Sequence, residues 1–155
     1  MFKLNIFRHR IHGWENGVID KNNLLNWVEE ARRLCIENNR EKIGDQYIGG
    51  FLSKAPIGAD GVWPCESVRE VLEYIKSEQL ARGLSTSVYN SRGSFIRGNG
   101  GEQEKELVVK YKEYAQFLKY DYPYVSEILN DIAKLWENTA KHYDNEEVLR
   151  KYIST

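Results

Sequence analysis

The chain has 155 residues and a formal net charge of −1, and 41% of its residues are hydrophobic and 29% charged. This composition is typical of one globular domain and argues against a disordered chain. Proteins that coat nucleic acid by bulk electrostatic attraction are usually strongly basic, so the near-zero charge disfavours that class. The two cysteines, Cys35 and Cys65, are too few for a disulfide scaffold and indicate free thiols in a reducing compartment.

Residues 1–17 are predicted as an N-terminal arm whose type of structure the pattern does not define, and residues 18–155 as a single helical domain. The start, MFKLNIFRHR, is too short in its apolar part and too interrupted by charge for a signal peptide. No apolar run is long enough to span a bilayer. We therefore expect a cytoplasmic protein that does not enter a membrane.

Three helices are predicted in the first half of the chain. Asp20 is a suitable N-cap for the first. The second covers residues 40–56, where several glycines mark either close helix contact or a break. The third has Pro64 in its first turn and ends at Gly83. The first helix has apolar residues at three- and four-residue spacing, namely Leu24, Trp27, Val28, Ala31, Leu34 and Cys35.

Residues 85–97 predict a β-hairpin, because strand-favouring residues flank the sequence NSRG. Asn90 and Gly93 suit a type I turn followed by a left-handed residue. A helix is expected from about Glu102 to Lys119. Pro123 opens a last helical segment, in which Asn145 either caps a short final helix or lies within one unbroken helix. The predicted fold is therefore mostly α, a bundle-like domain of five or six helices with one small β-hairpin.

No catalytic constellation is recognisable. The glycine loop before Glu102 lacks the ending of a P-loop, and the acidic first turn of the helix would repel a phosphate. Cys65 has no base at a meaningful spacing. His9 and His12 with Glu15 supply too few ligands for a zinc site. We expect no catalytic residues, no metal and no cofactor.

Two groups of residues are candidates for binding. Arginine beside aromatic rings can stack on bases or bind carboxylates, which makes the hairpin a candidate nucleic-acid site. The favoured alternative is a solvent-facing hairpin whose Arg97 pairs with Glu102 or Glu104. The tyrosine-rich run after residue 111 predicts either a protein-binding patch or the packed corner between two antiparallel helices. The hairpin group is Tyr89, Arg92, Phe95 and Arg97, and the second group is Tyr114, Tyr120, Tyr122 and Tyr124.

The chain resembles a known family in five stretches that occur in the same order and with similar gaps. They read NNLLNWVEEARRLC, IGDQYIGGFLSKAP, DGVWPCESVREVLE, VYNSRGSFIRG and GGEQEKELVVKY. These stretches are similar to the C-terminal helical domain of large, mostly uncharacterised bacterial proteins, and the similarity covers almost everything after about His12. The resemblance implies a bacterial cytoplasmic module that works as part of something larger, and it implies no catalytic residues.

The predicted function is a non-catalytic protein-interaction or assembly module. Its partner would be another protein, a larger chain of the same system or a second copy of itself, and its surface would come from the tyrosine-rich corner and the last helix. The alternatives are a nucleic-acid-binding module that uses the hairpin, which is less favoured, and an enzyme whose site the sequence does not reveal.

Overall fold

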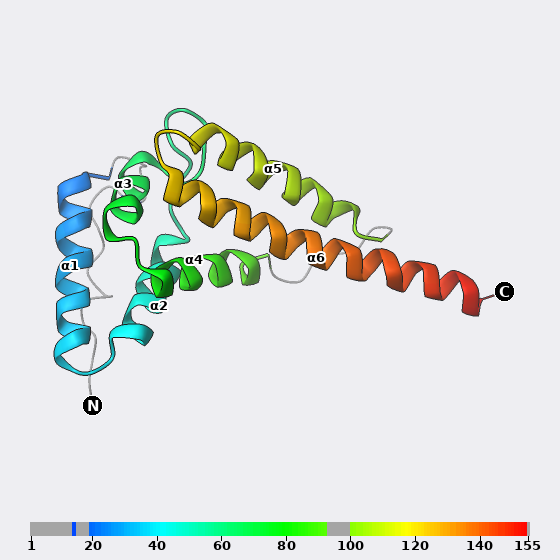
Figure 1. Cartoon of the computed structure of the whole chain (residues 1–155), viewed down its shortest axis with the longest axis horizontal. Coiled ribbons are helices and arrows are strands. Elements are labelled where there is room, and N and C mark those ends of the chain that lie inside the picture. The colour runs from blue at the N-terminus through cyan, green and yellow to red at the C-terminus, as the bar shows by residue number, and fades with distance from the viewer. Residues whose placement is uncertain (1–13, 15–18, 93–99, 155) are drawn as a thin grey trace. The chain divides into compact units, whose positions relative to one another are not determined.

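The structure is a computed structural model that describes Trp14, residues 19–92 and residues 100–154. These residues contain six helices and no strand (Figure 1). The predicted mostly α class is therefore confirmed. None of the described helices is both long enough and apolar enough to cross a bilayer. The helices are α1 (Lys21–Glu37), α2 (Glu41–Leu52), α3 (Glu66–Ile75), α4 (Glu78–Asn90), α5 (Glu102–Leu118) and α6 (Pro123–Ile153).

The predicted β-hairpin is wrong, because its first strand lies within α4. Leu80, Leu84 and Val88 are buried and recur every four residues, which is the period of a helix and not of a strand. Burial of this face outweighs the strand preference of Thr86 and Tyr89. The predicted second strand lies outside the described residues.

Internal contacts group the chain into two compact units, Met1–Ser87 and Val88–Thr155. We call them the N-terminal unit and the C-terminal unit. The N-terminal unit holds α1, α2, α3 and most of α4, and the C-terminal unit holds the end of α4 with α5 and α6. The single domain predicted for residues 18–155 stays a prediction.

Helix α1 begins where the sequence predicts. The Asp20 carboxylate accepts a hydrogen bond from the backbone N–H of Asn23 at 2.8 Å, which satisfies a free donor of the first turn. The buried face of α1 consists of Leu24, Val28, Ala31 and Cys35. It contributes to a core with apolar residues of the other helices, among them Ile48, Leu52, Val68, Leu72, Leu80 and Leu84.

Helices α2 and α4 contact each other at glycines. A Cβ at Gly49 would lie 2.0 Å from the carbonyl oxygen of Leu80, and a Cβ at Gly83 would lie 2.1 Å from that of Gln46. Both distances are far below van der Waals contact, so only glycine lets the two backbones approach this closely. The sequence predicted that a helix ends at Gly83. This prediction is wrong, because Gly83 lies in the middle of α4.

The helix predicted from Pro64 to Gly83 is in fact two helices. Lys76 takes a left-handed conformation with φ of 49° and ends α3. Ser77 then begins α4, because its hydroxyl accepts a hydrogen bond from the N–H of Leu80 at 3.2 Å. The same hydroxyl donates to the buried carboxylate of Asp45 at 2.5 Å, which ties the start of α4 to α2.

The C-terminal unit is built on α5 and α6, which run antiparallel. Ser126 in the first turns of α6 donates a hydrogen bond to the carbonyl oxygen of Ala115 near the end of α5, at 2.7 Å. At the other end, the N–H of Gly101 donates to the carboxylate of Asp144 at 2.9 Å. Leu118, Leu129, Ile132 and other apolar side chains between the two helices are buried.

Helix α6 is unbroken through Asn145 and extends beyond the start of α5 (Figure 1). Its last turns expose Val148, Leu149, Tyr152 and Ile153. At about 100° per residue, these side chains lie roughly opposite the buried face that carries Trp136 and Ala140. The apolar end of α6 is therefore not a continuation of the face that packs against α5.

Candidate interaction surface

Tyr89 and Arg92, predicted to contact nucleic acid, are part of the packing of the C-terminal unit. The Tyr89 hydroxyl is 2.8 Å from that of Thr139, and its ring lies 4.6 Å from the ring of Trp136. Arg92 donates to the carboxylate of Glu104 at 2.6 Å and lies over the Trp136 ring at 5.3 Å. These contacts give both residues a structural role. Phe95 and Arg97 lie outside the described residues.

We expect Arg92→Ala to destabilise the C-terminal unit by about 2 kcal/mol, because it removes a cation from a buried carboxylate. Glu104 is 1% exposed, so water cannot replace the lost partner. Chemical denaturation followed by circular dichroism, with hydrogen exchange to locate the loss in the C-terminal unit, would measure the change. Arg82→Ala, in an exposed and loosely paired arginine, is the control and should have almost no effect. Equal effects of the two variants would contradict this role.

The backbone at the start of α5 is bound by a carboxylate of the same unit. Asp144 accepts the N–H of Gly101 and also binds Lys105 at 2.8 Å. The hydrogen bond from Lys105 lowers the pKa of Asp144, so this carboxylate stays charged at the positive end of α5. The loop thus already holds an anionic group where a phosphate would bind.

The tyrosine-rich run forms the corner between α5 and α6. Tyr114, Tyr122 and Tyr124 are half-buried, whereas Tyr120 is 84% exposed. Tyr114 also makes an edge contact with Tyr111, with the ring centres 6.2 Å apart. Most of these rings therefore contribute to packing, and Tyr120 presents most of its ring to solvent.

The candidate nucleophile and metal ligands do not form a site in the described part of the chain. Cys65 lies at the start of α3, but it is buried, and burial raises the pKa of its thiol. Across the described ranges, no three His, Cys, Asp or Glu side chains are close enough to hold a metal ion. His9, His12 and Glu15 lie outside those ranges.

The N-terminal unit has a groove between α1 and α3, made of two depressions that share Tyr74. One has a volume of about 700 Å³ and is lined by Glu29, Arg32, Arg33, Ile36, Glu37, Tyr74 and Ile75. The other has a volume of about 420 Å³ and is lined by Lys21, Asn22, Leu25, Glu70, Val71, Glu73 and Tyr74. We call the two together the α1–α3 groove.

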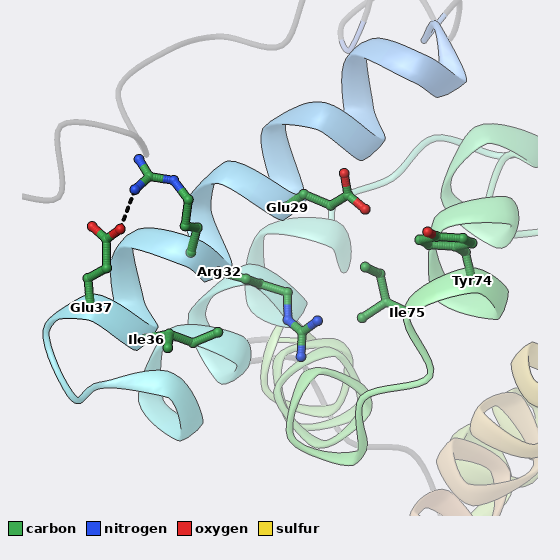
Figure 2. A pocket seen from close by; sticks show the side chains of 7 residues that line it. Glu29, Arg32, Ile36, Glu37, Tyr74 and Ile75 are labelled. Atoms are coloured by element: carbon green, nitrogen blue, oxygen red, sulfur yellow. Dashed lines mark hydrogen bonds and ion pairs between the residues drawn. The ribbon is translucent and has the colours of Figure 1, made fainter.

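The two depressions follow each other along α1. Asn22, Leu25, Glu29, Arg32 and Ile36 follow one another at intervals of three and four residues, so they lie along one stripe of the helix. Figure 2 shows the lower part of this stripe facing α3 across the first depression. The stripe lies beside the buried face of α1, which explains why it borders the core without belonging to it.

Apolar side chains are exposed on both sides of the groove. Ile36 on α1 is 50% exposed, and Tyr74 on α3 is 68% exposed. Figure 2 shows that Tyr74 and Ile75 project from the end of α3 on the side facing α1. A tyrosine that exposes so much of its ring beside other apolar groups is typical of an interaction surface.

Hydrogen bonds fix the arginine at the base of the groove. Arg32 donates to both oxygens of Asp45, from Nε at 2.8 Å and from Nη2 at 3.1 Å. This bidentate contact raises the pKa of Arg32 above its already high value. With Ser77 on the same carboxylate, the network joins α1, α2 and the start of α4 and holds the groove in place.

The sequence prediction missed this groove. Ile36 and Tyr74 do not belong to the apolar stripes of their helices, and this was the signal that could have pointed to it. The packing of α1 against α3, which places the two residues on the same groove, is not readable from either helix alone.

Comparisons with protein-family models, with curated proteins and with solved structures find no match to this chain.

Proposed function

We propose that this protein is a non-catalytic interaction module of the bacterial cytoplasm, and that its α1–α3 groove binds a segment of a partner protein. The observation that carries the proposal is a groove lined by apolar and charged side chains, in which the exposed Tyr74 borders both depressions and Arg32 is held by hydrogen bonds to Asp45. A rigid surface of this kind loses little conformational entropy on binding, which favours affinity.

Nucleic-acid binding has less support. The argument for nucleic-acid binding came from the predicted β-hairpin, whose first strand is in fact part of α4. Arg92 donates hydrogen bonds to Glu104 and Gln103 within the C-terminal unit. Catalysis also has little support in the groove, because Arg32 is bound to the carboxylate of Asp45 and the other charged side chains of the lining do not converge on one point. A protein partner fits the mixture of apolar and charged groups best.

The test compares the wild-type protein with a groove variant carrying Ile36→Asp and Tyr74→Ala. Both residues are half exposed or more, so the variant should fold. In a pull-down from a bacterial lysate, proteins that the wild type retains and the variant loses would be identified and purified. Each would then be titrated against both forms of the protein. We expect binding at least about tenfold weaker for the variant, as for other central interface residues.

A control variant carries Ile43→Asp and Tyr47→Ala, which make the same chemical changes at exposed positions of α2 outside the groove. It should bind the purified partner as tightly as the wild type. If the groove variant retains the same proteins with the same affinity, the proposed function is wrong.

A further inference from the structure

We infer that the end of α6 binds the end of α6 of a second copy of the chain, and that the two helices run antiparallel. This contact lies outside the α1–α3 groove and is independent of the proposed function. It follows from the apolar side chains that the last turns of α6 expose and from the order of the charges around them.

The last turns of α6 extend beyond the helix that α6 packs against. Asp144 accepts a hydrogen bond from the backbone N–H of Gly101, so this residue lies level with the start of α5. Residues 145–153 continue past that point for about 14 Å at 1.5 Å per residue (Figure 1). This part of α6 is therefore not packed against α5.

The apolar side chains of these turns share one face of the helix. They are Val148, Leu149, Tyr152 and Ile153, and each of them is at least half exposed. Their spacing of three and four residues places them along one side, roughly opposite the buried face of α6. Removal of such side chains from water drives association, so this face favours a partner that is itself apolar.

The charges around this face complement themselves when two copies run antiparallel. Glu146 and Glu147 precede Leu149 in the sequence. Arg150 and Lys151 follow it. In an antiparallel pair centred near Leu149, the acidic residues of each copy lie level with the basic residues of the other. A parallel pair would place the acidic residues of the two copies at the same level, where they repel each other.

Ion pairs within α6 do not prevent this contact. Glu147 binds Lys151 at 2.9 Å and Glu146 lies 3.4 Å from His142, and these pairs are exposed to solvent. Exposed pairs contribute little to stability and exchange partners readily. Glu146 and Arg150 are four residues apart and lie on the same side of the helix. A two-fold axis brings this side of both copies together, so Glu146 of each copy can bind Arg150 of the other.

The size of the face predicts a weak dimer. Each copy contributes only the last two or three turns of α6. Interfaces that bury less than about 1,200 Å² in total are typical of weak and transient complexes. We therefore expect the dimer to be in equilibrium with the monomer and not to be permanent.

The experiment is sedimentation velocity of the full chain over a wide range of protein concentrations. We expect the wild type to convert from monomer to dimer as its concentration rises. Leu149→Gln combined with Ile153→Gln should weaken dimerisation at least about tenfold. Circular dichroism should show unchanged helix content, because both positions are exposed and glutamine is a good helix former.

The control variant carries Val109→Gln and Phe117→Gln. These changes remove apolar side chains from exposed positions of α5, in the same unit of the chain. This variant should dimerise like the wild type.

Charge reversal tests the antiparallel arrangement. Glu146→Arg alone should weaken dimerisation about threefold or more at low ionic strength, because it brings like charges together. Adding Arg150→Glu should restore dimerisation, since the exchanged charges are again complementary. High salt should reduce both effects.

A wild type that stays monomeric at every concentration overturns the inference, and so does a dimer that Leu149→Gln with Ile153→Gln leaves unchanged. A monomeric wild type from which the same variant loses a protein of the lysate would assign the face to a different partner. If Arg150→Glu does not restore the dimer of the Glu146→Arg variant, the antiparallel arrangement is wrong.

The groove variant with Ile36→Asp and Tyr74→Ala separates this inference from the proposed function. It should dimerise like the wild type, because neither residue belongs to α6. Loss of the dimer in this variant would show that the groove, and not the end of α6, holds the two copies together.

Discussion

Gly83→Ala is expected to destabilise the N-terminal unit by about 3 kcal/mol. In an exposed helix interior the same change stabilises by up to about 1 kcal/mol, because alanine is the better helix former. Here the new methyl group would lie 2.1 Å from the backbone carbonyl oxygen of Gln46, so α2 and α4 would have to move apart. Urea denaturation, with hydrogen exchange to locate the change, would measure the loss in free energy of unfolding.

Gly50→Ala is the matched control within the same helical contact. Among the described residues, a Cβ there would meet only the side chain of Ser87, whose hydroxyl oxygen, at 2.9 Å, can rotate away. The expected loss is below about 1 kcal/mol. A Gly83→Ala variant as stable as the wild type would show that α2 and α4 do not cross at these glycines.

Arg69→Ala is expected to destabilise the N-terminal unit by about 3–5 kcal/mol. Arg69 is 1% exposed and binds both oxygens of Asp60, at 2.7 and 2.8 Å. It also donates to the carbonyl oxygens of Pro64 and Val62, at 2.5 and 2.6 Å. The alanine variant leaves the loop before α3 with several acceptors that have lost their donor. Thermal unfolding followed by circular dichroism would measure the loss.

Arg33→Ala is the control, because Arg33 is exposed and pairs only along α1 with Glu30 and Glu37. Its removal should leave the free energy of unfolding almost unchanged. If Arg69→Ala and Arg33→Ala have similar effects, the Arg69 contacts do not hold the loop together.

The same ion pair predicts a pH dependence. The hydrogen bonds from Arg69 lower the pKa of Asp60 to about 2, from a usual value of about 4. Since the pKa is lower in the folded state, the stabilisation is fully present above about pH 4 and is lost as the pH falls toward about 2. Asp60→Asn should lose this part of the acid sensitivity. An unchanged pH profile in that variant would contradict the assignment.

Helix α4 shows where local pattern misleads. Read alone, residues 85–89 favour a strand and Gly83 favours a helix end, because propensity describes a residue without its neighbours. In the folded unit, Gly83 permits contact with α2, and Leu80, Leu84 and Val88 form the buried face. The gain from burying this face exceeds the small local preferences.

The roles of Arg92 and Arg69 could not be read from the sequence for a related reason. Arginine is usually exposed, so a surface role was the natural interpretation of Arg92. Its carboxylate partner, Glu104, is twelve residues away, and Asp60 is nine residues from Arg69. Which charged side chains form buried ion pairs therefore depends on the folded arrangement of the chain.

The sequence by itself determined the helical class, the N-cap at Asp20 and the start of α6 at Pro123, because these depend on short-range spacing and capping. Tertiary structure decided the glycine contact between α2 and α4, the burial of Arg69 and Glu104, and the α1–α3 groove. Each of these depends on residues from different helices, and their relative positions follow from the packing of whole helix faces and not from any single segment.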